Sequence, residues 1–294
     1  MYQRLLKYIV GLLLLLTVSI DPVTAHRHAR GPRIGLVLGG GGAKGAAHVG
    51  VLRVLNEMQV PVHCVVGTSI GSIVGGLYAS GVSVDELEHL FLDQNWARLF
   101  ALEVVKRGSI EDLLRSLLPA NLPTDFDALP IPFRCVAVDA YTMREVVFSK
   151  GDVAQAMRAS MAIPAILRSV KTDSMKLVDG GVLNNLPVDV ARQMGADIVI
   201  AVDLQQNQHD PDKSDYKWDP TATKVPQVDW LLKRPDWDIY QRNKADADIV
   251  IHPNLKGYGV GSFSEKNIRE MITIGYQTAK KMQKKIKKTV KKGK

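Results

Sequence analysis

Residues 35–50, GLVLGGGGAKGAAHVG, join an apolar stretch to four consecutive glycines and then to a run of small residues. The apolar stretch is typical of a buried strand, and the residues that follow carry Val49, Leu52 and Leu55 at helical spacing. A glycine-rich turn between a strand and a helix directs backbone amides toward a negative charge. The stretch therefore predicts an α/β fold and raises the question of which negative charge it meets.

Strand-like and helix-like segments alternate along the rest of the chain. Apolar runs recur as VHCVVGTS at 62–69, PFRCVAVDA at 132–140, KLVDGG at 176–181 and DIVIAVDL at 197–204. Such alternation favours a mostly parallel sheet with helices on both faces. A chain of 294 residues with 46% hydrophobic composition is long enough for one substantial core. We therefore expect an α/β domain of three α/β/α layers around a mostly parallel central sheet.

The first 25 residues have the order of a secretory signal peptide. Arg4 and Lys7 precede the apolar segment at 8–20, and Val23-Thr24-Ala25 supplies a small-x-small cleavage site. The apolar segment is shorter than the roughly 20 residues that a membrane-spanning helix needs. We expect export to the periplasm or secretion, with the mature protein soluble or peripheral at a membrane. An uncleaved N-terminal anchor is the alternative.

Positive charge is concentrated at the other end of the chain. Residues 280–294, KKMQKKIKKTVKKGK, hold nine lysines and no acid, so they account for more than the whole net charge of +8. The tail at 281–294 is either a solvated helix end or a contact for anionic lipid headgroups. No nucleic-acid partner is expected, because no aromatic residues interleave the lysines. The oligomeric state stays open.

A long polar segment at 205–247 separates two predicted strands and is rich in aromatic residues. Its aromatic residues suit either a lid or interfacial patch at a membrane boundary, or a solvated excursion held by buried tryptophans; they are Tyr216, Trp218, Trp230, Trp237 and Tyr240.

Cys64 and Cys135 lie in apolar runs and are expected to be buried thiols, although export permits a disulfide. No metal-ligand spacing is present, and no cofactor is expected.

Neither cofactor interpretation of the glycine loop fits the sequence. Residues 40–45 match the dinucleotide fingerprint G-x-G-x-x-G, which also needs an acidic residue about 20 positions further on. The next predicted strand ends instead in Gly67-Thr68-Ser69. A phosphate-binding P-loop needs Lys-Ser or Lys-Thr, but Gly45 follows Lys44. The loop therefore belongs to another chemistry.

The second strand ends in Gly67-Thr68-Ser69-Ile70-Gly71, a G-x-S-x-G motif between a strand and a helix. This is the setting of a nucleophile elbow, where glycines relieve crowding around a serine in a tight turn. The glycine loop ends the neighbouring strand at the same sheet edge, so the amides of Gly41 and Gly42 can face the oxygen of a tetrahedral intermediate. The negative charge is then an oxyanion, and two tight turns without catalysis are the structural alternative.

The base for Ser69 is either Asp179, acting alone, or His252 in a triad with Asp179. Asp179 ends a predicted strand and is followed by Gly180-Gly181. The order Ser, Asp, His of the α/β-hydrolases is satisfied by Ser69, Asp179 and His252. His209 lies in a hydrophilic loop and His48 on the helix after the glycines, where a packed, hydrogen-bonded histidine is the more common outcome.

These blocks together resemble those of the bacterial patatin-like phospholipases. The resemblance runs over residues 33–280 and also includes AMRASMAIPAIL at 156–167 and LVDGGVLNNLPVDV at 177–190. It implies a lipid acyl hydrolase with a Ser69 nucleophile, an Asp179 base, no histidine, and oxyanion amides from Gly40, Gly41 and Gly42. Further motif positions that it implies are Lys44, Gly45, Gly67, Gly71, Gly180 and Gly181. It also implies that the segment from Arg158 to Pro164 lines the site. Much of the family has arginine where this chain has Lys44. We expect Lys44 either to bind phosphate or to form an ion pair.

Three classes of function follow from the sequence. The first is a secreted serine acyl hydrolase acting on phospholipids or lysophospholipids. The second is an esterase with a Ser69-Asp179-His252 triad. The third is a non-catalytic membrane-binding protein whose lysine tail does the binding.

Overall fold

A computed structural model describes residues 31–96, 98–99, 103, 108–164, 166–206 and 236–292. The predicted signal peptide lies outside the described residues. So does most of the long polar segment, including His209, Tyr216, Trp218 and Trp230.

Eight strands of the described chain form one sheet in the order β5-β6-β3-β2-β1-β7-β8, with β4 paired to β3. The strands are β1 (Ile34–Leu38), β2 (Val62–Thr68), β3 (Phe133–Asp139), β4 (Arg144–Phe148), β5 (Val170–Lys171), β6 (Lys176–Asp179), β7 (Ile198–Val202) and β8 (Ile249–Ile251). The neighbours β3-β2-β1-β7-β8 are all parallel. The three antiparallel pairings are β3 with β4, β3 with β6, and β6 with β5, so β4 and β6 are the strands that run against the others. The expectation of a mostly parallel sheet is confirmed.

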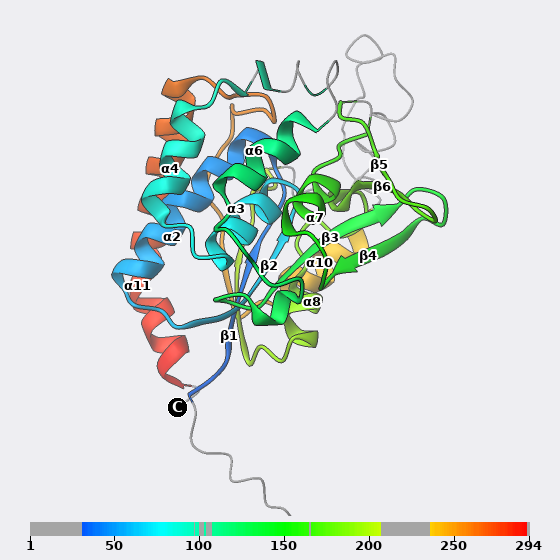
Figure 1. Cartoon of the computed structure of the whole chain (residues 1–294). Coiled ribbons are helices and arrows are strands. Elements are labelled where there is room, and N and C mark those ends of the chain that lie inside the picture. Colours follow the sequence, from blue (N-terminus) through cyan, green and yellow to red (C-terminus); the bar gives the residue numbers. More distant parts are fainter. Residues whose placement is uncertain are drawn as a thin grey trace, which may run out of the picture. The chain divides into compact units, whose positions relative to one another are not determined.

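Helices cover both faces of this sheet. The helices are α2 (Ala46–Glu57), α3 (Ile70–Ala79), α4 (Val84–Asp93), α6 (Ser109–Leu117), α7 (Val153–Ser160), α8 (Val188–Gln193), α10 (Trp237–Asp246) and α11 (Glu265–Lys292), with short 3₁₀ turns at Gly42–Gly45, Phe126–Ala128 and Gly180–Val182. In β1, Leu36 and Leu38 pack in the core shared with α2, α3, α7 and α11, whereas Val37 packs in the core shared with α8 and Tyr240 of α10. This alternation gives the expected three layers (Figure 1).

The strand register brings the ends of β2 and β6 together. Thr68 at the end of β2 pairs with Val136, and Asp179 at the end of β6 pairs with the next residue, Ala137. β4 pairs with both Val136 and Ala137 along one edge of β3. β2 and β6 must therefore both pair along the opposite edge of β3, where they meet end to end. The residue after Thr68 and the last residue of β6 therefore face the same point of the sheet.

α10 includes the last part of the predicted polar segment. Tyr240 is fully buried, and Trp237 packs beside it with ring centroids 5.9 Å apart. Tyr240 therefore has the buried alternative, whereas Trp237 is half-buried against it.

α11 extends from the edge of the sheet at which the parallel strands end to the opposite edge. Its first turn follows the loop in which the Val260 carbonyl accepts a hydrogen bond from the Ala43 amide (2.8 Å). Lys280 contacts Glu57 at the end of α2 (2.7 Å), and Ile286 is fully buried. Twenty-eight helical residues span about 42 Å, and Figure 1 shows the red end of α11 beside the start of β1. The described part of the lysine tail therefore continues this helix, away from the carboxyl ends of the strands. No helix in the described ranges is both long and apolar enough to cross a bilayer.

Candidate active site

Ser69 lies in a strained turn between β2 and α3. Its backbone has φ 55° and ψ −126°, in the region that favours glycine. The turn is tight because a Cβ on Gly67 would lie 2.4 Å from the Gly71 carbonyl oxygen, and one on Gly71 would lie 2.0 Å from that of Leu38. The two glycines that frame Ser69 in the sequence are thus required by the close approach of the backbone.

The Ser69 hydroxyl donates a hydrogen bond to Asp179. The distance from Oγ to Oδ2 is 2.6 Å, and the other carboxylate oxygen accepts the amide of Gly181 (2.7 Å). Both side chains are buried, with Ser69 5% and Asp179 6% exposed. The Gly181 contact fixes the rotation of the carboxylate, so that Oδ2 stays directed at the serine.

The environment makes Asp179 a stronger base than an ordinary aspartate. Burial raises the pKa of Asp179 to about 6, although the hydrogen bonds from Ser69 and Gly181 act in the opposite direction. A carboxylate with a pKa nearer to neutrality accepts a proton from a serine more readily, while it is still ionised at pH 7.

The end of α7 holds both members of this pair. The Ser69 amide donates to the Ser160 hydroxyl (2.9 Å), which itself donates to the Val136 carbonyl on β3 (2.6 Å). The Asp179 amide donates to the Ala162 carbonyl (3.0 Å). Ser160 was not singled out from the sequence, because nothing local connects it to a residue 91 positions away.

The glycine loop has two amides available for a ligand. Those of Gly39 and Gly40 donate to the carbonyls of Val202 (3.0 Å) and Asn185 (3.3 Å). The next two amides, of Gly41 and Gly42, have no partner among the described residues. The oxyanion prediction is therefore corrected: Gly40 is committed to the fold, and only Gly41 and Gly42 remain as donors from the loop.

Two buried polar side chains hold this loop in place. Asn185 accepts the Gly40 amide through its carbonyl and donates its side-chain amide to the Gly40 carbonyl (3.4 Å). His48 contacts the Gly39 carbonyl through Nε2 (2.8 Å), and burial lowers the pKa of His48 to about 4. A neutral ring that donates to a carbonyl is the packed histidine expected at this position. Asn185 is a site residue that the sequence analysis missed.

Lys44 lies beside the loop and has no ion-pair partner in the described part of the chain. It is half-buried, and its Cε lies 3.4 Å from the point that a Cβ on Gly41 would take. Burial lowers the pKa of Lys44, and the charge of Asp203 acts in the opposite direction. None of the described carboxylates lies within ion-pair distance of it, so the ion-pair alternative is not supported.

Arg158 anchors the predicted lining segment. Arg158 is 4% exposed and donates two hydrogen bonds to Glu103 (3.0 and 2.9 Å) and one to the Arg168 carbonyl (2.9 Å). Its Nε and Nη2 hold Glu103 and the segment after α7, whereas Nη1 has no hydrogen-bond partner among the described residues. Arg158 also lines a cavity of about 410 Å³ together with Glu103 and Arg168, so its role as a substrate-lining residue stays a prediction. Pro164 lies half-buried in that segment, after the Ala162 carbonyl that contacts Asp179.

His252 is bound elsewhere. Its Nδ1 lies 3.0 Å from the Asp203 carbonyl and 3.5 Å from the Asp203 carboxylate. Although burial opposes ionisation, hydrogen bonds from His252, the Gln205 amide and Tyr240 keep the pKa of Asp203 below its usual range. The structure does not place His252 between Ser69 and Asp179, which contact each other directly.

The two cysteines are free and buried. Burial raises the pKa of Cys64 to about 11 and raises that of Cys135 further. The buried-thiol prediction is confirmed. Among the described residues, no group of His, Cys, Asp and Glu is arranged to hold a metal ion.

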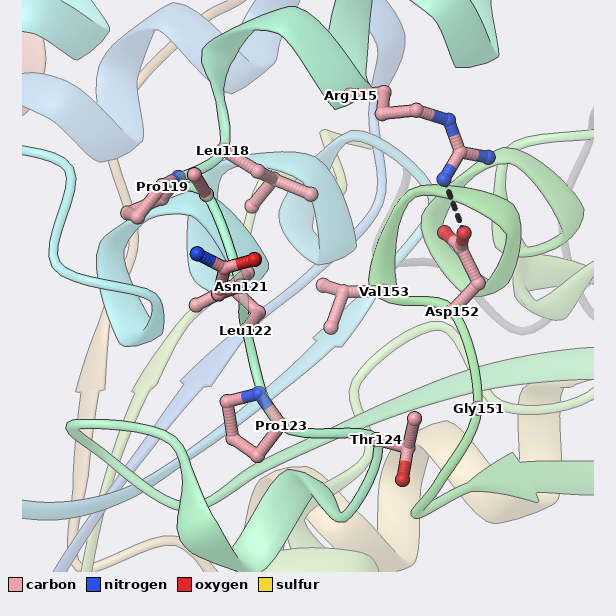
Figure 2. A pocket seen from close by; sticks show the side chains of 11 residues that line it. Arg115, Leu118, Pro119, Asn121, Leu122, Pro123, Thr124, Gly151, Asp152 and Val153 are labelled. Atoms are coloured by element: carbon pink, nitrogen blue, oxygen red, sulfur yellow. Dashed lines mark hydrogen bonds and ion pairs between the residues drawn. The ribbon is translucent and has the colours of Figure 1, made fainter.

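A cavity of about 620 Å³ lies away from these residues, between the end of α6 and the start of α7. Figure 2 shows Leu118, Leu122 and Val153 around a common space, with the Arg115–Asp152 ion pair at its side. None of the predicted site residues lines it. Because Ser160 lies at the other end of α7, this cavity is separate from the Ser69–Asp179 pair.

Comparison with known proteins gives one family and one fold. The sequence model described as patatin-like phospholipase matches residues 36–192. An uncharacterized NTE family protein of Mycobacterium bovis is 33% identical over 207 residues, 65% of this chain and 55% of that protein. Lysophospholipase NTE1 of Mycosarcoma maydis is 38% identical over 186 residues, 60% of this chain and 10% of that protein. The chain thus spans about half the length of the first relative and a tenth of the second.

A likeness to a solved structure supports the fold alone. VipD from Legionella pneumophila superimposes with a TM-score of 0.52 at 14% identity, over 86% of this chain and 67% of that one.

Proposed function

The chain belongs to the patatin-like phospholipase family, and on that premise we propose that it is a lipid acyl hydrolase. The proposed substrates are the carboxylic esters of phospholipids or lysophospholipids. The observation that carries the proposal is the 2.6 Å hydrogen bond from the Ser69 hydroxyl to a buried carboxylate of raised pKa.

In the proposed reaction Ser69 Oγ attacks the ester carbonyl carbon and its proton passes to Asp179 Oδ2. The carbonyl oxygen becomes an oxyanion that accepts hydrogen bonds from the backbone amides of Gly41 and Gly42, beside the N-terminus of α3. The C–O bond to the leaving alcohol then breaks, and the alcohol takes the proton from Asp179. Water hydrolyses the acyl-serine by the same steps, releasing the fatty acid and regenerating both residues.

The contacts favour this pair over a histidine triad. Asp179 Oδ2 already accepts from the serine, and its other oxygen accepts from Gly181. His252 is bound to Asp203 instead. The non-catalytic alternative is less well supported, because a fold with no reaction to perform has no need of a strained serine hydrogen-bonded to a buried carboxylate.

We also propose export and lipid contact by the tail. Export rests on the order of residues in the first 25 positions. Tail contact rests on the lysines of α11 beyond Lys280, which are exposed where the structure describes them.

The proposal is tested with the full chain on a soluble short-chain ester and on lysophosphatidylcholine, with released fatty acid measured by mass spectrometry. Ser69→Ala and Asp179→Asn should each lower kcat by on the order of 10³-fold or more. Ser80→Ala is the matched control, because Ser80 is a buried serine at the far end of α3 whose hydroxyl has no partner among the described residues. Wild-type rates in either variant, or no hydrolysis of any lipid ester by the wild type, would contradict the proposal.

A further inference from the structure

We propose that the protein meets a phospholipid aggregate with the carboxyl edge of its sheet, through an apolar rim made of Tyr141, Met143, Ile166 and Val260. This inference rests on the proposed function, since a lipid ester has to reach Ser69 from that edge.

The rim is defined first by exposure. Five large apolar side chains of the described chain are exposed: Tyr141 (66%), Val260 (51%), Ile166 (50%), Met143 (44%) and Val147 (37%). The first four lie in connections between elements, whereas Val147 lies within β4.

Two members of the rim lie beside the candidate active site. The Val260 carbonyl accepts the Ala43 amide (2.8 Å), and it lies 2.5 Å from the point that a Cβ on Gly42 would take. Ile166 belongs to the segment after α7, in which the Ala162 carbonyl accepts the Asp179 amide. Val260 thus lies against the glycines that are proposed to bind the oxyanion. Ile166 lies four residues after Ala162, whose carbonyl holds Asp179.

The other two members lie further along the same edge. Tyr141 and Met143 form the turn from β3 to β4, and β3 runs parallel to β2. The carboxyl ends of parallel strands share one edge of a sheet. Because Ala137 is level with Asp179, this turn projects beyond the catalytic pair. A tyrosine, with an apolar ring and a polar tip, suits the boundary of a lipid layer.

Burial of Ser69 gives such a contact a use when the lipid starts from an aggregate. With the serine 5% exposed, an ester reaches it only if part of the lipid leaves the aggregate and enters the protein. Apolar side chains around the entrance replace the lipid contacts that are lost in that transfer.

Exposed lysines gather at the opposite edge of the sheet. The exposed lysines of α11 between Lys281 and Lys291 lie beyond the contact of Lys280 with Glu57, at the far end of α2. A flat bilayer that touches the rim therefore lies away from these lysines.

The rim's own edge has the exposed cations Arg144, next to Met143, and Lys171. Because phosphatidylcholine has no net charge, binding of the rim to phosphatidylcholine should depend on apolar contact and little on these cations.

The test measures binding separately from hydrolysis. In a Ser69→Ala background, flotation with phosphatidylcholine vesicles is compared for Ile166→Ser/Val260→Ser, Tyr141→Ser/Met143→Ser and the matched control Val147→Ser. Each double variant should lower vesicle partitioning about tenfold, as the loss of two half-exposed apolar side chains implies. Val147→Ser should stay within about twofold of its parent, and 1 M salt should leave the parent's binding intact. Thermal unfolding of every variant shows that it is folded, and the four single variants replace any double variant that is not.

Three results would overturn the inference: rim variants that float like the parent, a Val147→Ser loss as large as theirs, or parental binding that 1 M salt abolishes. Binding that depends on the rim in a protein without hydrolase activity would contradict the proposed function alone. Hydrolase activity with vesicle binding that ignores the rim would contradict this inference alone.

Discussion

A single carboxylate can serve as the base at the Ser69 site because burial and hydrogen bonding act on it in opposite directions. Burial raises the pKa of Asp179 to about 6, while the bonds from Ser69 and Gly181 keep it from rising further. The group stays ionised at neutral pH and is still a better proton acceptor than a solvated aspartate.

The activity should therefore follow the ionisation of Asp179. Only the carboxylate form accepts the serine proton, so kcat/KM on an uncharged soluble ester should rise with pH and level off above about 6. Below that value it should fall about tenfold per pH unit. A profile that is flat from pH 5 to pH 8 would contradict Asp179 as the base.

His252 should be dispensable for the chemistry. His252→Ala removes a contact with Asp203 and none with Ser69 or Asp179, so hydrolysis should stay within about tenfold of wild type. Loss of a true triad histidine lowers kcat by on the order of 10⁴-fold. A fall of that size in a variant whose thermal unfolding matches wild type would return the assignment to the triad.

At this scale the sequence predicted the residues that motifs identify and missed those that act through distant contacts. Ser69 and Asp179 stand next to glycines in recognisable blocks, and the structure brings the two together. Ser160 and Asn185 lie in recognisable blocks too, but their contacts with the site cross 91 and 145 positions of sequence, so the sequence did not show what they bind. Likewise, the partner of Arg158, Glu103, lies 55 positions away.

At the scale of elements, the decisive arrangement is that β2 and β6 meet end to end along β3. The parallel strands were predictable, because each is a continuous apolar run beside a helix. The antiparallel direction of β6 was not, because four residues carry no signal of direction and their partner Ala137 lies about 40 positions earlier. Likewise, the sequence marks the glycine loop but not the Asn185 carbonyl that takes the Gly40 amide.

The glycine loop should not tolerate a side chain at Gly42. This residue has φ +58°, and a Cβ would lie 2.5 Å from the Val260 carbonyl oxygen, so Gly42→Ala should displace the loop and its amides. Loss of one oxyanion donor lowers kcat by on the order of 10²-fold.

Gly108→Ala is the matched control for Gly42→Ala. Gly108 also has a positive φ (+88°), but nothing lies within 4 Å of its Cβ position. Its substitution should lower thermal stability slightly and leave ester hydrolysis near wild type. Equal activity of the two folded variants would show that the loop does not need its observed conformation.

At the scale of the whole molecule, the four exposed apolar residues of the rim and the exposed lysines of α11 lie at opposite edges of one sheet. The sequence predicted a lysine tail but not where it lies, because that depends on the packing of α11 along α2. Ile286 is fully buried within the tail, so lysine substitution is a cleaner test than truncation.

Replacing Lys284, Lys285, Lys287 and Lys288 with glutamine should weaken binding to phosphatidylglycerol vesicles at low salt. Headgroup attraction of up to about 1 kcal/mol per lysine predicts a loss of at least tenfold. Salt at 1 M should remove the difference, since the Debye length falls to about 3 Å. Soluble-ester hydrolysis and phosphatidylcholine binding should be unchanged, and four arginines at the same positions should behave like wild type. Unaltered phosphatidylglycerol binding by the glutamine variant would make the tail a solvated helix end.

The most direct test of the catalytic pair is labelling by a fluorophosphonate, which an activated serine attacks as it attacks an ester. The site and rate of adduct formation are measured by peptide mass spectrometry in wild type, Ser69→Ala, Asp179→Asn and Ser80→Ala. We expect one adduct, on the peptide that contains Ser69, formed at the wild-type rate in Ser80→Ala. It should be absent in Ser69→Ala and form at least about 10³-fold more slowly in Asp179→Asn. An adduct on another residue, or undiminished labelling of Ser69 in Asp179→Asn, would contradict the account.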